Sequence, residues 1–181
     1  MSLVVLGRPR LKPADAAWIT ALRDRHGTEL AAPELGPHVT LVFPTDATDA
    51  TTATGHLAMV AGETPPLDLA FRCALSVLDP ESGDSFVYLV PDEGFSSLVR
   101  LHDRLYSGPF AEALRLDLPY IPHITLARIA EAKLARALAD DLNGQEPEIH
   151  ARLETVELFR VGDDPGGTEP ARRLAEIPLR G

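Results

Sequence analysis

The sequence predicts an α+β fold in which two strand–helix–strand–helix units repeat, with approximate two-fold symmetry, around a central cleft. Two observations predict it. A five-residue string occurs twice, as PHVTL at residues 37–41 and as PHITL at residues 122–126, 85 positions apart. The same order of strand-like and helix-like patterns surrounds both copies. The 181 residues suit one bilobal domain over residues 1–181, with halves at roughly 1–66 and 86–145 and the remaining strands completing the sheets.

The first half begins with a short apolar run at residues 3–6, which predicts a strand. Pro13 then opens a helix whose apolar residues recur at helical spacing as far as residue 26. The first copy of the string follows as a strand that ends at Pro44, and a second helix is predicted over residues 48–62. This half therefore has the order strand, helix, histidine-bearing strand, helix.

The second half repeats this order. Residues 86–90 predict a strand closed by Pro91, and a helix follows with Asp92 as its N-cap. The second copy of the string is again a strand. The next helix is predicted over residues 131–142, where an Asn-Gly pair stops it.

Three further stretches predict the strands that complete the sheets. Residues 67–78 form a long apolar run that begins with alternation, and residues 149–161 alternate in part. The string DDPGG at residues 163–167 is a strong turn signal. Residues 172–179 then predict a final strand that pairs back across this turn.

Composition limits the possible partners. The chain has 17 Lys and Arg against 27 Asp and Glu, a net charge of −10, so it repels a phosphate backbone overall and is not expected to bind long duplex nucleic acid. No apolar run of about 18 residues predicts a membrane span, and no signal peptide is visible. One cysteine, Cys73, allows no internal disulfide and no cysteine-based zinc site. We therefore expect a cytoplasmic protein, and we expect it to be a monomer.

Both copies of the string place an imidazole and a hydroxyl on one face of a strand. Alternation directs His38 with Thr40, and His123 with Thr125, toward the cleft. One neutral histidine can take a proton from water or a hydroxyl, and the other, protonated, can give one to the departing oxygen. The hydroxyls can donate to non-bridging phosphate oxygens. The pattern predicts phosphoester chemistry without a metal or other cofactor, and with ring pKa values near 6.5 its optimum lies at about pH 6–8.

The two strings resemble the paired His-x-Thr motifs of the two-histidine phosphoesterase superfamily, in its 2′-5′ RNA ligase-like and cyclic phosphodiesterase-like branch. The resemblance covers nearly the whole chain because the order of elements agrees as well. It implies metal-independent attack on a 2′,3′-cyclic phosphate of a nucleotide or RNA end, or reversible 2′-5′ ligation of RNA. It also implies that His38 and His123 are catalytic and that Thr40 and Thr125 bind the substrate phosphate.

Three neighbours of the strings are further candidates for substrate contact. Related sequences often keep a basic residue where Arg128 stands, so it can meet a substrate phosphate. Strict alternation places it on the face opposite His123, however, where a surface salt bridge is equally consistent. Tyr120 precedes the second strand and can stack on a base. Phe43 can stack too, but alternation places it on the core-facing side of its strand.

Two other function classes stay open. A non-catalytic module that binds an RNA end or a nucleotide keeps the same pocket, and turnover of a 2′,3′-cyclic nucleotide by pure protein separates it from an enzyme. A metallohydrolase can use both histidines as ligands. It needs a third ligand at fixed spacing, and the chain contains no His-x-His or His-x-x-x-His. Activity that survives EDTA dismisses this class.

Overall fold

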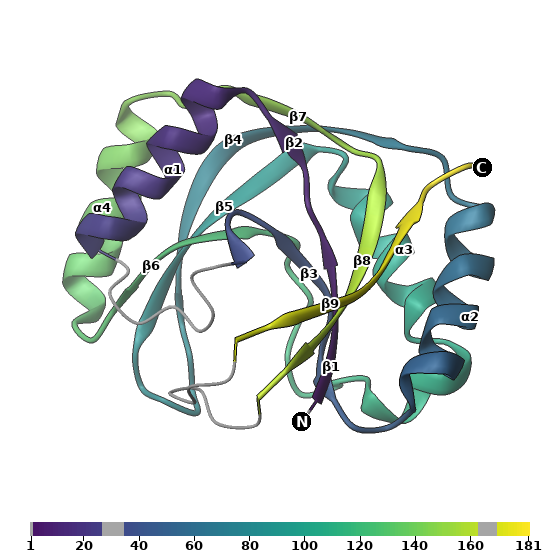
Figure 1. The fold of residues 1–181 in the computed structure, drawn as a ribbon. Coiled ribbons are helices and arrows are strands. Elements are labelled where there is room, and N and C mark those ends of the chain that lie inside the picture. The colour runs from purple at the N-terminus through teal and green to yellow at the C-terminus, as the bar shows by residue number, and fades with distance from the viewer. Residues whose placement is uncertain (1, 27–34, 163–169) are drawn as a thin grey trace.

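The computed structural model describes residues 2–26, 35–162 and 170–181 and contains two curled antiparallel sheets (Figure 1). The first sheet has the order β3-β1-β8-β9, formed by Val39–Thr45, Ser2–Gly7, Thr155–Val161 and Arg172–Pro178. The second has the order β2-β7-β4-β5-β6, formed by Arg10–Leu11, Ile149–Leu153, Leu67–Leu78, Ser85–Glu93 and Ile124–Ile129. The predicted α+β class is confirmed.

The strand order also confirms the duplication. Each histidine string enters an edge strand, β3 or β6, which pairs with the first strand of its own repeat, β1 or β5. The next strands inward, β8 and β4, correspond to each other, as do β9 and β7. The short strand β2, which the sequence analysis did not predict, extends the second sheet alone. The two histidine strands are therefore equivalent positions of a two-fold repeat.

The described residues form four α-helices, and two of these pack on the other repeat. The four helices are α1 (Pro13–His26), α2 (Ala50–Gly62), α3 (Phe95–Leu105) and α4 (Ala132–Gly144), with a 3-10 helix at Gly108–Ala113. Helix α1 packs on β6 of the other repeat, and α3 packs on β3. In Figure 1, α1 therefore lies beside α4 on one side of the molecule, while α2 and α3 lie on the other. None of the helices in the described part of the chain is long and apolar enough to span a membrane.

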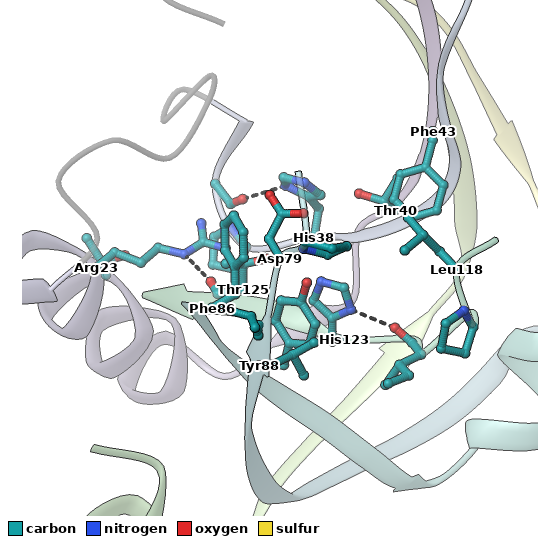
Figure 2. Close-up of a pocket in the computed structure, with 18 of the residues that line it drawn as sticks. Arg23, His38, Thr40, Phe43, Asp79, Phe86, Tyr88, Leu118, His123 and Thr125 are labelled. Atoms are coloured by element: carbon teal, nitrogen blue, oxygen red, sulfur yellow. Dashed lines mark hydrogen bonds between the residues drawn. The ribbon is translucent and has the colours of Figure 1, made fainter. Parts of the chain in front are cut away.

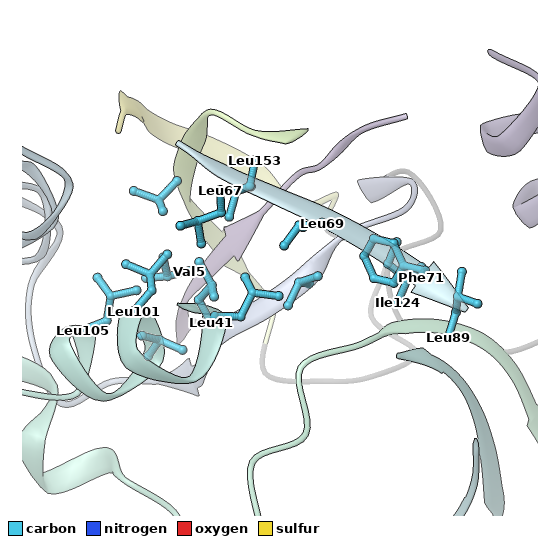
Figure 3. Close-up of a cluster of buried hydrophobic side chains, with 14 of the residues drawn as sticks. Val5, Leu41, Leu67, Leu69, Phe71, Leu89, Leu101, Leu105, Ile124 and Leu153 are labelled. Carbon is cyan, nitrogen blue, oxygen red and sulfur yellow. The ribbon is translucent and has the colours of Figure 1, made fainter. Parts of the chain in front are cut away.

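The core holds both histidine strands in place. Val39, Leu41, Ile124 and Leu126, the apolar residues that alternate with the histidines and threonines, are completely buried. Figure 3 shows Leu41 and Ile124 within one cluster that also contains leucines of β4 and α3. Burying an aliphatic side chain of this size stabilises the fold by about 1.5–3 kcal/mol relative to leaving it exposed. These anchors fix the direction in which the intervening side chains point.

Both histidine strands contain a β-bulge three residues after the histidine. In β3, the residues on either side of Leu41 pair with consecutive residues of β1, so Leu41 is the extra residue. In β6, Leu126 is extra in the same way relative to β5. A bulge shifts the alternation by one residue. The prediction that Phe43 packs in the core is wrong for this reason: Phe43 is 37% exposed and lines a cavity.

Two element predictions need correction. The stretch 149–161 forms two strands in different sheets, β7 and β8, with a break at Glu154. Strand β5 also does not end at Pro91, because an irregular pairing with β4 accommodates the proline. Asp92 therefore lies in the strand and pairs with Arg72, and the N-cap of α3 is Gly94.

Gly94 turns the chain from β5 into α3. Its φ is +82°, and an added Cβ would lie 2.6 Å from the carbonyl oxygen of Asp68, so this tight turn requires glycine. At the other end of the chain, β8 and β9 pair antiparallel as predicted. The turn signal between them, residues 163–167, lies outside the described residues.

Candidate active site

A cavity of about 1010 Å³ brings together the four residues that the repeated strings predicted. Figure 2 shows His38 and Thr40 from one repeat and His123 and Thr125 from the other around this cavity. The rest of the described wall comes from α1, from the end of β4 with its following turn, from β5, from the segments before β3 and β6, and from β3 itself: Thr20, Arg23, Asp24, Val77, Leu78, Asp79, Pro80, Phe86, Tyr88, Gly36, Pro37, Leu118, Pro119, Ile121 and Phe43.

Each histidine ring is oriented by the same backbone contact. Nδ1 of His38 lies 2.9 Å from the carbonyl oxygen of Gly36, and Nδ1 of His123 lies 2.6 Å from that of Ile121. A carbonyl oxygen only accepts hydrogen bonds, so Nδ1 carries the hydrogen in both rings. Nε2 of each neutral ring is then an unprotonated base. It is the nitrogen that can exchange a proton with a bound molecule.

Burial lowers the pKa of both histidines to about 4. Desolvation is the largest cause in each case, and the backbone carbonyl at Nδ1 opposes it. The charges of Arg23 and Arg8 lower the pKa of His38 further, whereas Glu157 raises it, and the charge of His38 lowers the pKa of His123. The expected ring pKa near 6.5 is therefore too high for the free protein, and at pH 7 both rings are neutral unless an anion binds beside them.

An aromatic wall supports the second histidine. The ring of Tyr88 stacks on that of His123, with centroids 3.5 Å apart and planes inclined by 15°. Phe86 lies two residues earlier on the same face of β5, and its ring lies 6.0 Å from that of Tyr88. Sequence reasoning missed both residues. Alternation along residues 86–90 is the signal that places them on one face, but only pairing with β6 brings that face to the histidine.

The comparisons with known proteins decide the family. The model of the 2′-5′ RNA ligase superfamily matches residues 11–165. The chain belongs to the 2′-5′ RNA ligase superfamily. This confirms the resemblance carried by the two strings, and it assigns the protein to a superfamily of two-histidine phosphoesterases and 2′-5′ RNA ligases. None of the curated proteins compared with the chain matches it.

Solved structures of other proteins share the superfamily fold. Escherichia coli LigT in its apo form has a TM-score of 0.65 at 21% identity, covering 99% of this chain and 98% of LigT. TT0787 of Thermus thermophilus has a TM-score of 0.67 at 19% identity, covering 100% of this chain and 99% of TT0787. Usb1 of Kluyveromyces marxianus has a TM-score of 0.53 at 12% identity, covering 99% of this chain and 97% of Usb1. These similarities establish the fold of this superfamily member.

Tyr120 contacts β3 and does not line the cavity. Its hydroxyl donates to the carbonyl oxygen of Thr40 at 2.9 Å, and its ring stacks on buried His102 with centroids 3.7 Å apart. Nearby, the Tyr106 hydroxyl accepts a hydrogen bond from the backbone N–H of Phe43 at 2.9 Å. Because β3 is an edge strand, the two hydroxyls replace a neighbouring strand and hold the strand that carries the first histidine.

We expect Tyr120→Phe to lower the free energy of unfolding by about 1 kcal/mol, the usual worth of one hydrogen bond. Tyr106→Phe should lower it by a similar amount. Tyr88→Phe is the control, because the Tyr88 hydroxyl has no hydrogen-bond partner among the described residues. Urea unfolding measures all three, and an unfolding midpoint for Tyr120→Phe equal to that of the wild type would show that its hydroxyl does not hold β3.

Arg128 lies on the cavity face of its sheet but does not line the cavity. It pairs directly with Phe86 across β5 and β6, so the bulge at Leu126 places it on the same face as Thr125, and strict alternation predicted the wrong face. Its Nε donates to Asp84 at 2.7 Å, and its guanidinium carbon lies 5.7 Å from the centroid of the Phe86 ring. The salt bridge that the sequence left open is therefore formed.

Proposed function

We propose that this protein is a metal-independent phosphoesterase that acts on the 2′,3′-cyclic phosphate of a nucleotide or RNA end, or that joins such ends reversibly by a 2′-5′ bond. The observation that carries the proposal is the pair of imidazoles on one cavity, each with Nδ1 held by a backbone carbonyl and Nε2 available. Membership in the superfamily supports this general chemistry.

The proposed hydrolysis uses the two histidines as base and acid. Nε2 of one ring takes a proton from water, and the water oxygen attacks phosphorus. The bond between phosphorus and one ribose oxygen breaks, and the second ring, as imidazolium, gives its Nε2 proton to that oxygen. The hydroxyls of Thr40 and Thr125 donate to the non-bridging oxygens. The product is a ribose monophosphate, and in ligation a hydroxyl of a second nucleotide takes the place of water.

The size and lining of the cavity favour a nucleotide over a bare phosphate. About 1010 Å³ lies at the upper end of the range for sites that bind small organic molecules. Phe43, Phe86 and Tyr88 line it and offer faces on which a base can stack. The structure of Escherichia coli LigT complexed with 3′-AMP supports a nucleotide substrate as well.

In this proposal residues 1–181 act as one cytoplasmic monomer that needs no cofactor. The unit includes both repeats because cavity residues come from Thr20 through to Thr125. Its partner is a cyclic nucleotide or an RNA end bearing a cyclic phosphate. Long duplexes are not partners, because a net charge of −10 repels an extended phosphate backbone.

The experiment is a turnover screen with purified protein. A panel of 2′,3′-cyclic nucleotides and short RNAs ending in a cyclic phosphate is incubated with and without EDTA. We expect the monophosphate to form at a rate that EDTA leaves unchanged. Binding without turnover would favour the non-catalytic module, and loss of turnover in EDTA would favour a metallohydrolase. In residues 2–26, 35–162 and 170–181, no group of three or more His, Cys, Asp or Glu side chains is placed to hold a metal ion.

A further inference from the structure

Positive charge is scarce in the cavity. Among its described lining residues, Arg23 is the one lysine or arginine, whereas Asp24 and Asp79 contribute carboxylates. The two histidines carry little charge at pH 7, because burial lowers the pKa of both rings to about 4. An incoming phosphate anion therefore meets one fixed cation in this part of the wall.

Arg23 reaches the cavity because α1 crosses to the histidine strand of the other repeat. Its Nε donates to the carbonyl oxygen of Thr125 at 2.8 Å, the residue whose hydroxyl is proposed to hold the phosphate. This bond uses one of the five guanidinium N–H groups. The four N–H groups on Nη1 and Nη2 remain as donors for a bound molecule. Figure 2 shows the side chain extending from α1 toward Thr125, and its charge acts on the His38 ring.

Among the described residues, Arg23 also lacks a carboxylate partner such as Arg128 and Arg8, two other partly buried arginines, have. Arg128 pairs with Asp84 at 2.7 Å and Arg8 pairs with Glu157 at 3.0 Å, but no residue within the three described ranges forms an ion pair with Arg23. Burial lowers the pKa of its guanidinium, as expected for a cation that is withdrawn from water without an anion. A bound phosphate would supply that anion.

We propose that Arg23 binds the non-bridging oxygens of the substrate phosphate through its Nη1 and Nη2 groups, and that Arg128 does not. The inference rests on the proposed function and names the cationic contact of the same site. A planar guanidinium that is held at Nε can present two parallel donors to a phosphate. Arg128 already has a carboxylate partner in Asp84, and it does not line the cavity.

The test compares the binding of 3′-AMP and of adenosine by isothermal titration calorimetry. We expect Arg23→Met to weaken 3′-AMP binding by about 10- to 100-fold, the worth of hydrogen bonds to a charged group, and to leave adenosine binding unchanged. Arg23→Lys keeps the positive charge but removes the two parallel N–H donors of the guanidinium. It should therefore weaken 3′-AMP binding by a smaller but measurable factor. Arg25→Met is the matched control, because Arg25 is exposed on the same helix and also bonds a backbone carbonyl through Nε.

Several outcomes would overturn the proposal. One is equal affinity of Arg23→Met and the wild type for 3′-AMP; if Arg23→Met does not fold, wild-type affinity in Arg23→Lys decides in the same way. A second is that the wild type binds 3′-AMP no better than adenosine. A third is that Arg128→Met weakens 3′-AMP binding whereas Arg23→Met does not. Because binding is measured apart from turnover, Arg23-dependent binding by a wild type that hydrolyses no cyclic phosphate would sustain this inference while the proposed function fails.

Discussion

His38→Ala and His123→Ala should each lower kcat/KM for a 2′,3′-cyclic nucleotide by at least ~10²-fold, since each removes the proposed general acid or general base. The double variant should be little worse than either single variant, because the two rings act in the same step. Initial rates of monophosphate formation measure the effect. Both side chains line the cavity, whereas the core is built from the residues between them, so the fold should survive truncation.

Matched variants separate the histidines from the rest of the site. Thr40→Ala and Thr125→Ala should each cost about 1.5–3 kcal/mol in transition-state stabilisation, the worth of one hydrogen bond to a charged group. His150→Ala should keep the wild-type rate, because His150 lies on β7 with its side chain half exposed and outside the cavity lining. A folded His38→Ala or His123→Ala protein with wild-type rates would make that residue structural.

The second large effect is on pH dependence. The profile of kcat/KM should peak at about pH 4–5, and not at the pH 6–8 expected from unperturbed rings, because burial lowers the pKa of both histidines. It should fall about tenfold per pH unit above the peak, since kcat/KM follows the free enzyme and the proposed mechanism needs one protonated ring. Both rings have a pKa of about 4 in the free protein. The two limbs belong to the coupled pair, not to either histidine alone. Steady-state rates from pH 4 to 9 measure the profile.

The profile of kcat should peak at higher pH than that of kcat/KM. A phosphate anion beside the rings favours the imidazolium form and raises both pKa values in the complex. A flat kcat/KM between pH 5 and 8 would contradict the two-histidine mechanism. A rising limb that reaches a plateau above about pH 9 and disappears with EDTA would instead indicate a metal-bound hydroxide.

The same burial of the two histidines makes the folded state sensitive to acid. The rate measurements therefore need a control for unfolding at low pH. The unfolded chain binds protons at these rings near pH 6.5, whereas the folded protein binds them only near a pKa of about 4. Stability that is fully present above pH 6.5 is therefore lost as the pH falls toward 4. Unfolding midpoints measured at each pH show where the rates report on native protein.

The repeated strings were sufficient to predict the duplicated fold and the four residues that meet at the cavity. This succeeded because the signals are local. Alternation within residues 37–41 and 122–126 determines which side chains enter the core, and Val39 and Ile124 are completely buried as it requires. The same alternation predicted the wrong faces for the residues beyond Leu41 and Leu126. A bulge depends on the pairing with β1 and β5, and no residue in the two strings indicates that pairing.

Tertiary packing explains what the sequence could not predict about the site. Arg23 sits in the last turn of a helix of the first repeat, and nothing in residues 13–26 indicates that α1 lies on β6. Tyr120 likewise appeared as a candidate base-stacking residue, whereas its hydroxyl bonds the backbone of β3. The low pKa of both rings also depends on packing, since burial is its largest cause. Tyr88 of β5, which stacks on His123, is one of the residues that bury it.

The central claim is that the two histidines of the cavity hydrolyse a cyclic phosphate without a metal. Phosphorus NMR of the products formed from a 2′,3′-cyclic nucleotide in EDTA tests it most directly, comparing the wild type with the double variant His38→Ala, His123→Ala. We expect the wild type to form one monophosphate isomer, because a base and an acid held at two fixed positions of the cavity wall determine which ribose oxygen departs. The double variant should form none above the uncatalysed background. Equal product from both proteins, or no product from the wild type, would contradict the claim.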